Sequence, residues 1–459
     1  MSTRNVKMPD MMHTPDNHDD ARKGAMRDDE RRRTQQEANA DLLVSRRSFL
    51  SGTLRTGAFL GLAGGALSSA VAVAGASGCS SEEVVTPLTV STDNITTAEE
   101  LDELEKYTTC VKLFASWDMP YGTIVFNSTP DLAVCLVPTE SASPLTHVYI
   151  LNPLTGDRNR VIRNAMGADE GFEVYDARGT SRGLIWVEAN IFTREWRVYM
   201  GLLDGGSLAD ITMVDAGDGE WEMPSVAVSG DYGFWQVRPR LDGSHTMDDS
   251  LLKKAVFGSA MASVAFTSHG RFATPIYPMQ NKLVITPRND FNNLNHYQLT
   301  LLNALTNVVE DRLCLQTGMR PVEAGYGVNG FNFSFDAIYD YGDGISNLGT
   351  YTPYEAVTDG RYSDRHWFAF VRVPTAPPCW CGNYFIVKST TAVLGIDLQL
   401  NRYFVLDVQI GADSYGEYLA TTGTSSTFVT YTNIDSTPIV GKPRKTCNIR
   451  VWQHANASS

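Results

Sequence analysis

The sequence lacks the short motifs that most readily mark an enzyme. It contains no phosphate-binding loop of the form Gly-x-x-x-x-Gly-Lys-Ser/Thr and no His-Glu-x-x-His zinc motif. Its eight histidines are scattered without the spacing of metal ligands. No catalytic residue, metal or cofactor is therefore assigned from the sequence, and the pattern leans away from an enzyme.

Basic residues are also scarce relative to acidic ones. The 459 residues include 38 Lys and Arg against 52 Asp and Glu, a formal net charge of −14. Beyond residue 78 the balance is 27 basic to 43 acidic, a net charge of −16. Such a body repels nucleic acid and anionic headgroups, so nucleic acid is not an expected partner. The simplest interpretation of the acidity is that it keeps the protein soluble.

The chain has little continuous hydrophobic sequence, and its one long uncharged stretch lies near the N-terminus. No charged residue occurs between Arg55 and Glu82. The stretch is rich in Gly, Ala and Ser, which makes it a poor permanent membrane span. It follows Ser45-Arg46-Arg47-Ser48-Phe49-Leu50, which resembles a twin-arginine export signal. The resemblance implies export through the twin-arginine translocase; an N-terminal transmembrane anchor is the alternative.

The uncharged stretch ends in Ala76-Ser77-Gly78-Cys79, which resembles a lipoprotein processing site. The resemblance implies that Cys79 carries a lipid and tethers the protein to the cell membrane on its extracytoplasmic side. Cleavage near Ala76 without a lipid, giving a secreted protein, is the alternative. The predicted segments are a disordered charged region 1–44, a signal peptide 45–78, a spacer 79–107 and a β-propeller domain 108–455. Translation from Met26 is a further alternative.

Cysteine is infrequent. Besides Cys79 the chain has six: Cys110, Cys135, Cys314, Cys379, Cys381 and Cys447. An even number in an oxidising compartment makes these six candidates for disulfide bonds, and free buried thiols are an equal alternative. A metal site with His366 is a third reading, which lacks the paired ligand spacing of zinc sites.

Long segments with helical periodicity are missing after about residue 108. The one helix predicted is short, over Thr97–Glu105, with Thr96 or Thr97 as its cap. The rest reads as short β-rich runs between turn residues. One type of run recurs after turns, at Gly122–Phe126, Gly183–Glu188, Gly233–Val237, Lys282–Thr286, Phe335–Tyr339, His366–Val371 and Thr427–Tyr431. A second type follows at His147–Asn152, Trp196–Met200, His296–Leu301, Ala392–Asp397 and Cys447–Trp452.

The recurring runs predict an all-β fold made of small repeated sheets. Their spacing brackets the repeat length of propellers, in which radially arranged sheets cover each other's faces. The pattern resembles bacterial β-propellers, including the Tol-type periplasmic propellers, and implies about seven blades, with six or eight as alternatives. Tandem β-sandwiches are the other fold considered. We expect the segment 108–115 to pair with 449–452, because each otherwise lacks a partner strand.

Two groups of acidic residues are candidates for chemistry. Asp336, Asp340 and Asp343 could gather around calcium, although a Gly/Asp turn explains them better. Glu188 and Glu195, beside Trp186 and Trp196, could form the acid pair of a sugar-cleaving site, although surface glutamates near core tryptophans explain them better. The function predicted is a binding module for protein, peptide or glycan, with a hydrolase or lyase on the same scaffold as the alternative.

Overall fold

The computed structural model describes residues 86–138, 147–291, 294–335, 344–345, 348–372, 376–436 and 444–455. All of these residues belong to one compact unit. Within them no helix is long and apolar enough to cross a membrane. Arg46, Arg47, Phe49, Leu50 and Cys79 lie outside the described residues, as do Asp336, Asp340 and Asp343.

The described strands form seven mainly antiparallel sheets, which we number in chain order. Sheet 1 holds β4 (Ile124–Ser128), β5 (Ala133–Val137), β6 (His147–Leu151) and β7 (Arg158–Ile162). Sheet 2 holds β8 (Glu173–Thr180), β9 (Gly183–Asn190), β10 (Glu195–Asp204) and β11 (Ser207–Gly217). Sheet 3 holds β12 (Ser225–Ser229), β13 (Tyr232–Val237), β14 (Ser250–Val256) and β15 (Ser263–Ser268). Sheet 4 holds β16 (Tyr277–Met279), β17 (Lys282–Ile285), β18 (Arg288–Phe291), β19 (Leu294–Asn303) and β20 (Val309–Cys314).

The remaining sheets also recruit strands from elsewhere in the chain. Sheet 5 holds β21 (Glu323–Gly327), β22 (Gly330–Phe335), β23 (Gly349–Pro353) and β24 (Trp367–Phe370), with β1 (Ile95–Thr97) added at its edge. Sheet 6 holds β25 (Cys379–Cys381), β26 (Tyr384–Lys388), β27 (Val393–Asp397) and β28 (Arg402–Val405), with β2 (Asp102–Glu103) and β30 (Gly423–Ser425) at its two edges. Sheet 7 holds β29 (Tyr418–Leu419), β31 (Thr427–Ser436), β32 (Arg444–His454) and β3 (Val111–Pro120).

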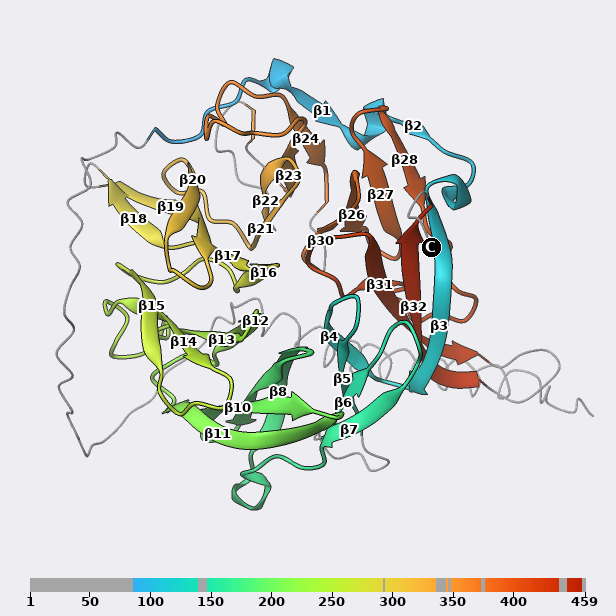
Figure 1. Cartoon of the computed structure of the whole chain (residues 1–459). Helices are drawn as coiled ribbons and strands as arrows, with labels where there is room; N and C mark the ends of the chain where they lie inside the picture. The colour runs from blue at the N-terminus through green and yellow to red at the C-terminus, as the bar shows by residue number, and fades with distance from the viewer. Residues whose placement is uncertain are drawn as a thin grey trace, which may run out of the picture. The chain divides into compact units, whose positions relative to one another are not determined.

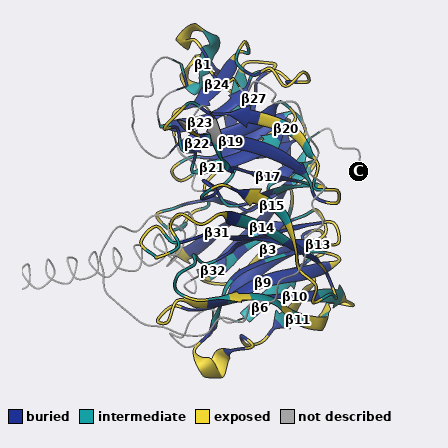
Figure 2. Ribbon diagram, turned by 90° about the vertical axis from the view of Figure 1, so that its left-hand side faces the viewer, coloured by how far each residue is buried: buried dark blue, intermediate teal, exposed yellow. Residues whose placement is uncertain are grey.

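The sheets stand around a common centre; β4, β8, β12, β16 and β21 are the innermost strands of sheets 1 to 5, and the added strand β30 lies inside β25 in sheet 6 (Figure 1). We call β4, β8, β12, β16, β21, β25 and β29 the inner strands. The buried apolar side chains form seven clusters within the described residues, one between each pair of neighbouring sheets. Figure 2 shows the burial along the strands and the exposure of the loops. Burying one large apolar side chain contributes roughly 1.5–3 kcal/mol, so the ring is stabilised mainly between its sheets. The prediction of an all-β propeller is thereby confirmed, and tandem β-sandwiches are not formed.

The repeat is more regular than the sequence pattern suggests. The second strands, β5, β9, β13, β17, β22, β26 and β31, begin 43 to 54 residues apart. The recurring runs identified from the sequence are strands wherever the structure describes them, but they occupy different places in their sheets. Gly122–Phe126 contains most of an inner strand, β4, whereas His366–Val371 contains an outer strand, β24. The recurring runs are unequally spaced in the sequence because they include inner strands from some sheets and outer strands from others.

The ring closes through the pairing expected of the two chain regions. β3 pairs antiparallel with β32, with Val111 opposite His454 and Trp117 opposite Ile449. A bulge between Leu113 and Ala115 interrupts the register, so the alternation of faces of a regular strand does not continue through this point. The closing sheet covers an edge that would otherwise be open to other chains.

The segment before β3 differs from the predicted spacer. From residue 86 onward it follows the outer edges of sheets 4 to 6 (Figure 1). The Leu88 amide donates to the Cys314 carbonyl at 2.8 Å, and β1 and β2 pair in parallel with β24 and β28. The helix predicted over Thr97–Glu105 is wrong. Only a 3-10 turn forms, Ala98–Glu100, with a capping box between Thr97 and Glu100, because the open sheet edges favour extended chain beyond it.

Protein also fills part of the ring centre. The segment between β29 and β31 leaves sheet 7, and its strand β30 pairs in parallel with β25 of sheet 6. The hydroxyl of Tyr277 on β16 accepts a hydrogen bond from the Gly423 amide at 2.7 Å and donates to the Pro378 carbonyl at 2.7 Å. Gly423 has φ +74°, and a Cβ there would lie 3.2 Å from the Cα of Met279. Glycine is therefore required where β30 approaches β16.

Candidate functional site

The strongest candidate site lies at the end of the ring where the inner strands begin. Each second strand runs antiparallel to its inner strand and so ends at the same place, as Gln236 of β13 does opposite Ser225 of β12. An isolated bridge between Trp221 and Pro239 carries this pairing past the end of β13. Gln236 and Arg238, two residues apart in extended chain, therefore project to the same side.

Three consecutive sheets, 3 to 5, bring polar side chains to this end. We call Gln236, Arg238, Glu222, Arg271 and Arg320 the arginine cluster. Glu222 precedes β12, Arg271 precedes β16 and Arg320 precedes β21. Arg238 Nη2 lies 3.2 Å from Glu222 Oε2, and Arg271 forms an ion pair with Glu222 Oε1 through its own Nη2. Arg271 Nη1 also donates to the Pro239 carbonyl.

Burial determines the electrostatics of the arginine cluster. The side chains of Arg238 and Arg271 are only 8% and 9% exposed. Burial lowers the pKa of Arg238; Glu222 raises it, whereas Arg271 and Arg320 lower it. Arg238 and Arg271 share the Glu222 carboxylate, and Arg320 adds a further positive charge that acts on Arg238, so positive charge is in excess here inside a body that is strongly acidic. A buried excess of positive charge is costly unless an anion offsets it.

Several polar atoms of the arginine cluster have no hydrogen-bond partner among the described residues. They are Nε of Arg238, Nε of Arg271 and Oε1 of Gln236. Gln236 is fully buried, and its Nε2 donates to the Thr274 carbonyl at 3.2 Å, which fixes the amide and leaves Oε1 free. A buried polar atom without a partner costs roughly 1–3 kcal/mol, so these two donors and one acceptor are suited to a ligand or to waters that a ligand displaces.

Acidic groups lie near the ring axis beside this cluster. Arg178 of β8 lies 3.2 Å from Asp176 and stabilises the charged form of Glu323 at the start of β21, in a sheet across the ring. Burial raises the pKa of Glu323 to about 8, with Arg178 opposing the shift. Burial also raises the pKa of Asp176, opposed by Arg178 and by a hydrogen bond from the Ala177 amide. These two carboxyl groups can hold a proton at a pH where ordinary carboxyls cannot.

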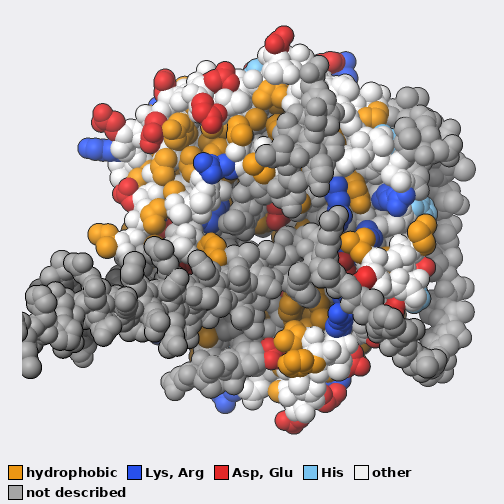
Figure 3. Space-filling model, turned by 180° about the vertical axis from the view of Figure 1, so that it is seen from behind, with side chains coloured by type: hydrophobic (Ala, Val, Ile, Leu, Met, Phe, Trp, Pro, Cys, Tyr) orange, Lys and Arg blue, Asp and Glu red, His pale blue; other side chains and the backbone are white. Residues whose placement is uncertain are grey.

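Loops at the same end of the ring expose apolar side chains. Phe192, between β9 and β10, is 89% exposed, and Met247, between β13 and β14, is 87% exposed. Ile410, ahead of β29, is 95% exposed. Figure 3 shows one face of the protein, on which hydrophobic side chains lie in scattered patches between charged groups. Exposed apolar side chains on loops around a polar centre are suited to binding rather than to core packing.

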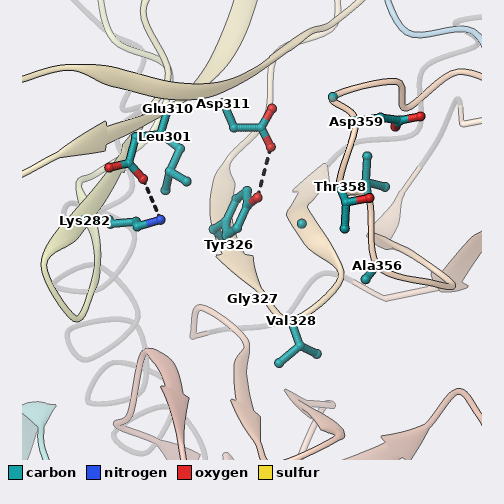
Figure 4. A pocket seen from close by; sticks show the side chains of 13 residues that line it. Lys282, Leu301, Glu310, Asp311, Tyr326, Gly327, Val328, Ala356, Thr358 and Asp359 are labelled. Carbon is teal, nitrogen blue, oxygen red and sulfur yellow. Dashed lines mark hydrogen bonds and ion pairs between the residues drawn. The ribbon is translucent and has the colours of Figure 1, made fainter.

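A cleft lies at the opposite end of the ring, between sheets 4 and 5 (Figure 4). This cleft has a volume of about 670 Å³. The turn between β21 and β22 and the segment Ala356–Gly360 form its walls. Asp311 accepts hydrogen bonds there from the hydroxyls of Tyr326 at 3.0 Å and Tyr362 at 2.5 Å.

The charged groups of this cleft are matched to one another. Lys282 Nζ lies 2.5 Å from Glu310 Oε2, and Asp359 pairs with Arg361 and Arg365. The Arg361 amide and both guanidinium groups lower the pKa of Asp359. Burial and the Asp311 carboxylate raise the pKa of Tyr326. Because its charged groups are paired with one another, the cleft offers a ligand fewer unpaired groups than the arginine cluster does.

The acidic pair proposed from the sequence does not form a catalytic site. Glu188 is fully buried and accepts hydrogen bonds from the amides of Met166 and Gly167 at 2.6 and 2.9 Å, and from Trp186 Nε1 at 3.0 Å. It fastens the loop before β8 to β9. Glu195 is exposed and accepts from the Thr193 hydroxyl. The two carboxylates thus have separate structural roles.

The six described cysteines are buried free thiols, one of the alternatives left open by the sequence. Burial raises the pKa of Cys135 and Cys381 to about 12 and that of Cys314 to about 11, so these remain protonated and unreactive at neutral pH. His366 Nε2 lies 2.8 Å from the Thr96 hydroxyl at the sheet edge. Within the described part of the chain, no three His, Cys, Asp or Glu side chains gather in a way that could hold a metal.

Two patterns that accompany catalysis in other folds occupy hairpin turns here. Gly179–Gly183 reads Gly-x-Ser-x-Gly and links β8 to β9. Gly325–Gly330 reads Gly-x-Gly-x-x-Gly and links β21 to β22. A nucleophile elbow and a dinucleotide-binding loop both require a helix after the turn. A strand follows in each case, so neither pattern has the context its chemistry needs.

Sequence reasoning missed the arginine cluster. Its members span residues 222–320 and follow no fixed spacing. The one available signal was Gln236 and Arg238 directly after the buried run of β13, since polar residues at the end of a buried strand reach the rim of a sheet.

Comparison with known proteins gives a likeness of fold. No protein-family model and no curated protein matches the sequence. Similar solved structures include oligogalacturonate lyase from Vibrio parahaemolyticus, with 10% identity over 74% of this chain and 97% of the other and a TM-score of 0.42. The β-propeller domain of the Trilobed protease from Pyrococcus furiosus has 10% identity over 60% and 84% of the two chains and a TM-score of 0.35.

A longer protein is also similar in part. Acylaminoacyl peptidase from Pyrococcus horikoshii has 10% identity and a TM-score of 0.37, covering 61% of this chain. This chain spans about half of the peptidase, 46% of its length. At these identities and TM-scores the likenesses concern the β-propeller fold and give no activity to this chain.

Proposed function

We propose that this protein is an extracytoplasmic binding module that holds its ligand at the end of the ring where the inner strands begin. One observation carries the proposal: buried donors and an acceptor without partners gather there in the arginine cluster. Loops with exposed apolar side chains surround that end. A rigid ring carrying variable loops is suited to binding a protein, peptide or glycan.

The proposal includes the route to the cell surface. Arg46 and Arg47 direct export of the folded protein, and Cys79 receives the lipid that tethers it, or the protein is secreted after cleavage nearby. Replacing both arginines with lysine is expected to leave precursor in the cytoplasm. Mass spectrometry of the mature N-terminal peptide decides between lipid on Cys79 and an unmodified end.

We also propose that each of the seven sheets is one blade, since a separate buried cluster lies between each pair of neighbours within the described residues.

The binding proposal is tested with a thermal-shift panel of organic acids, sugars, amino acids and short peptides. We expect at least one compound to raise the melting temperature of the wild type, and Arg238→Lys to reduce that shift. Asp311→Asn, in the cleft at the opposite end, is the matched control and should keep it. The reverse pattern, in which only Asp311→Asn loses the shift, would place the ligand in the cleft and refute the proposal.

The alternative function is a hydrolase or lyase on the same scaffold. The observation in its favour is Glu323, whose pKa of about 8 suits a general acid or base at neutral pH. Nuclear magnetic resonance of the bound compound after long incubation separates the two functions. An unchanged compound supports a binding module, whereas conversion that Glu323→Gln abolishes would establish the enzyme.

A further inference from the structure

The arginine cluster also indicates which chemical groups a ligand must carry. Each buried Nε–H is a donor from a charged group and calls for an anionic acceptor. The guanidinium groups of Arg238 and Arg271 each form an ion pair with Glu222 through Nη2, and these ion pairs hold both guanidinium planes in place. The cluster therefore presents two fixed donors from two different arginines, and a carboxylate has two oxygens with which to accept from them.

The free oxygen of Gln236 adds a second requirement. Because Nε2 of Gln236 is engaged with the Thr274 carbonyl, the remaining atom Oε1 can only accept a hydrogen bond. A ligand with acceptors alone, such as acetate, would leave this oxygen unpaired. A ligand with a hydroxyl beside its carboxylate would satisfy it. Gln236 and Arg238 project to the same side, and Arg271 shares Glu222 with Arg238.

The charge of the site favours an anionic ligand. Glu222 contacts both arginines through their Nη2 atoms, and a carboxylate on the ligand would pair with the two Nε donors that Glu222 leaves unused.

This inference rests on the proposed function: we propose that the arginine cluster binds a hydroxycarboxylate. The carboxylate accepts from Nε of Arg238 and Nε of Arg271, and the neighbouring hydroxyl donates to Oε1 of Gln236. The same chemistry occurs in a free hydroxy acid and in a sugar acid of a glycan, and the test separates these two sources.

Isothermal titration of the full mature chain with matched pairs of probes tests the proposal. L-malate and succinate differ in the hydroxyl, and D-glucuronate and D-glucose differ in the carboxylate. We expect L-malate or D-glucuronate to bind at least tenfold more tightly than its partner in the pair, and inorganic phosphate to bind more weakly than either. Tighter binding of L-malate indicates a free acid, and tighter binding of D-glucuronate indicates a sugar acid.

Variants that keep the charge isolate the proposed contacts. Arg238→Lys and Arg271→Lys can still pair with Glu222 but lack Nε, and each should weaken the preferred probe at least tenfold. Gln236→Met should reduce the preference for L-malate over succinate to about twofold or less. Arg182→Gln, which breaks an exposed ion pair with Asp231 in the β8–β9 turn, is the control and should bind like the wild type. Circular dichroism confirms that each variant folds.

The outcomes separate this inference from the proposed function. Equal binding of L-malate and succinate, tighter binding of phosphate, unchanged binding by both lysine variants, or no binding of any carboxylate probe would overturn the hydroxycarboxylate assignment. The binding module itself would survive these results if another compound from the thermal-shift panel bound in an Arg238-dependent manner. It would fall if no bound compound depended on any residue of the arginine cluster.

Discussion

Two buried groups of arginine and glutamate differ in how fully their hydrogen bonds are used. In sheet 7, Arg450 donates to Glu417 from Nε at 3.0 Å and pairs with it again at 2.7 Å, and it also donates to the Asp407 carbonyl. Its guanidinium lies 4.8 Å from the centre of the Trp452 ring. In the arginine cluster the Nε atoms of Arg238 and Arg271 have no partner among the described residues.

The difference separates a structural role from a binding role. The Arg450–Glu417 pair has its Nε donor matched and lies within the sheet that closes the ring, so it fastens the loop before β29 to that sheet. The arginine cluster is equally buried but unsaturated, and it stands at a loop-rich end. Buried charge that is fully paired favours one structure, whereas buried charge with spare donors favours an additional molecule.

The largest effect is expected where the Arg450–Glu417 pair is removed together with its strand. Deleting residues 446–459 removes most of β32 and leaves β3 without a partner. Because the seven buried clusters lie between neighbouring sheets, opening one sheet exposes the clusters on both sides of it. We expect loss of the cooperative thermal transition, measured by circular dichroism. An internal deletion of residues 87–105 is the control and should melt cooperatively at a lower temperature. If the protein without residues 446–459 melts cooperatively near the temperature of the full chain, the ring does not depend on the pairing of β3 with β32.

Breaking the Arg450–Glu417 pair alone should have the next largest effect. Glu417→Ala leaves Arg450 buried without its carboxylate, which costs about 3–5 kcal/mol. Glu417 is fully buried, so water cannot replace the lost partner. Urea unfolding measures the change in the free energy of unfolding. Glu195→Ala, an exposed carboxylate with a hydroxyl partner, should change it by less than about 0.5 kcal/mol. A loss below 1 kcal/mol in Glu417→Ala would contradict the structural role.

A glutamate-to-alanine substitution in the arginine cluster should lower the free energy of unfolding by less than Glu417→Ala does. The melting temperature of this variant should also respond to ligand. Glu222→Ala removes the carboxylate shared by Arg238 and Arg271, but Glu222 is 21% exposed, so water offsets part of the loss. We expect a loss of roughly 1–3 kcal/mol. Excess L-malate should raise the melting temperature of both variants by mass action, and that of Glu222→Ala by more, because there it also offsets the positive charge that the lost carboxylate leaves. An equal response of the two variants would remove the distinction drawn between the clusters.

The smallest effect concerns pH. Since the pKa of Glu323 is raised from 4.5 to about 8 in the folded protein, the folded state holds a proton that the unfolded state has released between these values. Stability should therefore fall as the pH rises from about 5 to about 8, at most by a few kcal/mol. Glu323→Gln should flatten this decline in melting temperature.

An exposed carboxylate provides the control for the pH experiment. The pKa of Asp359 is lowered, so its contribution to stability is lost only as the pH falls below that of ordinary carboxyls. Asp359→Asn should leave the slope above about pH 5 unchanged. A Glu323→Gln protein with the slope of the wild type would show that Glu323 titrates normally.

Much of the fold could be predicted from local sequence. Runs such as Gly183–Glu188 and Trp196–Met200 form strands because β-branched and aromatic residues between turns favour extended chain. The partner of 108–115 could be inferred because an isolated terminal strand leaves an open edge. Thr97, one of the two caps expected, forms a capping box with Glu100, but tertiary contact with the outer sheet edges decided that no helix follows.

The sequence by itself determined the all-β character, the repeated strands and the pairing of the two chain regions, because each depends on residues close together or on an edge without a partner. Only the tertiary structure decided which buried charges are saturated. The sequence made Glu188 a candidate for chemistry and gave Arg238 no role, yet Glu188 has three donors around it and Arg238 has an Nε without an acceptor among the described residues. Whether a buried group finds a partner depends on segments tens of residues away, whose arrangement no local pattern records.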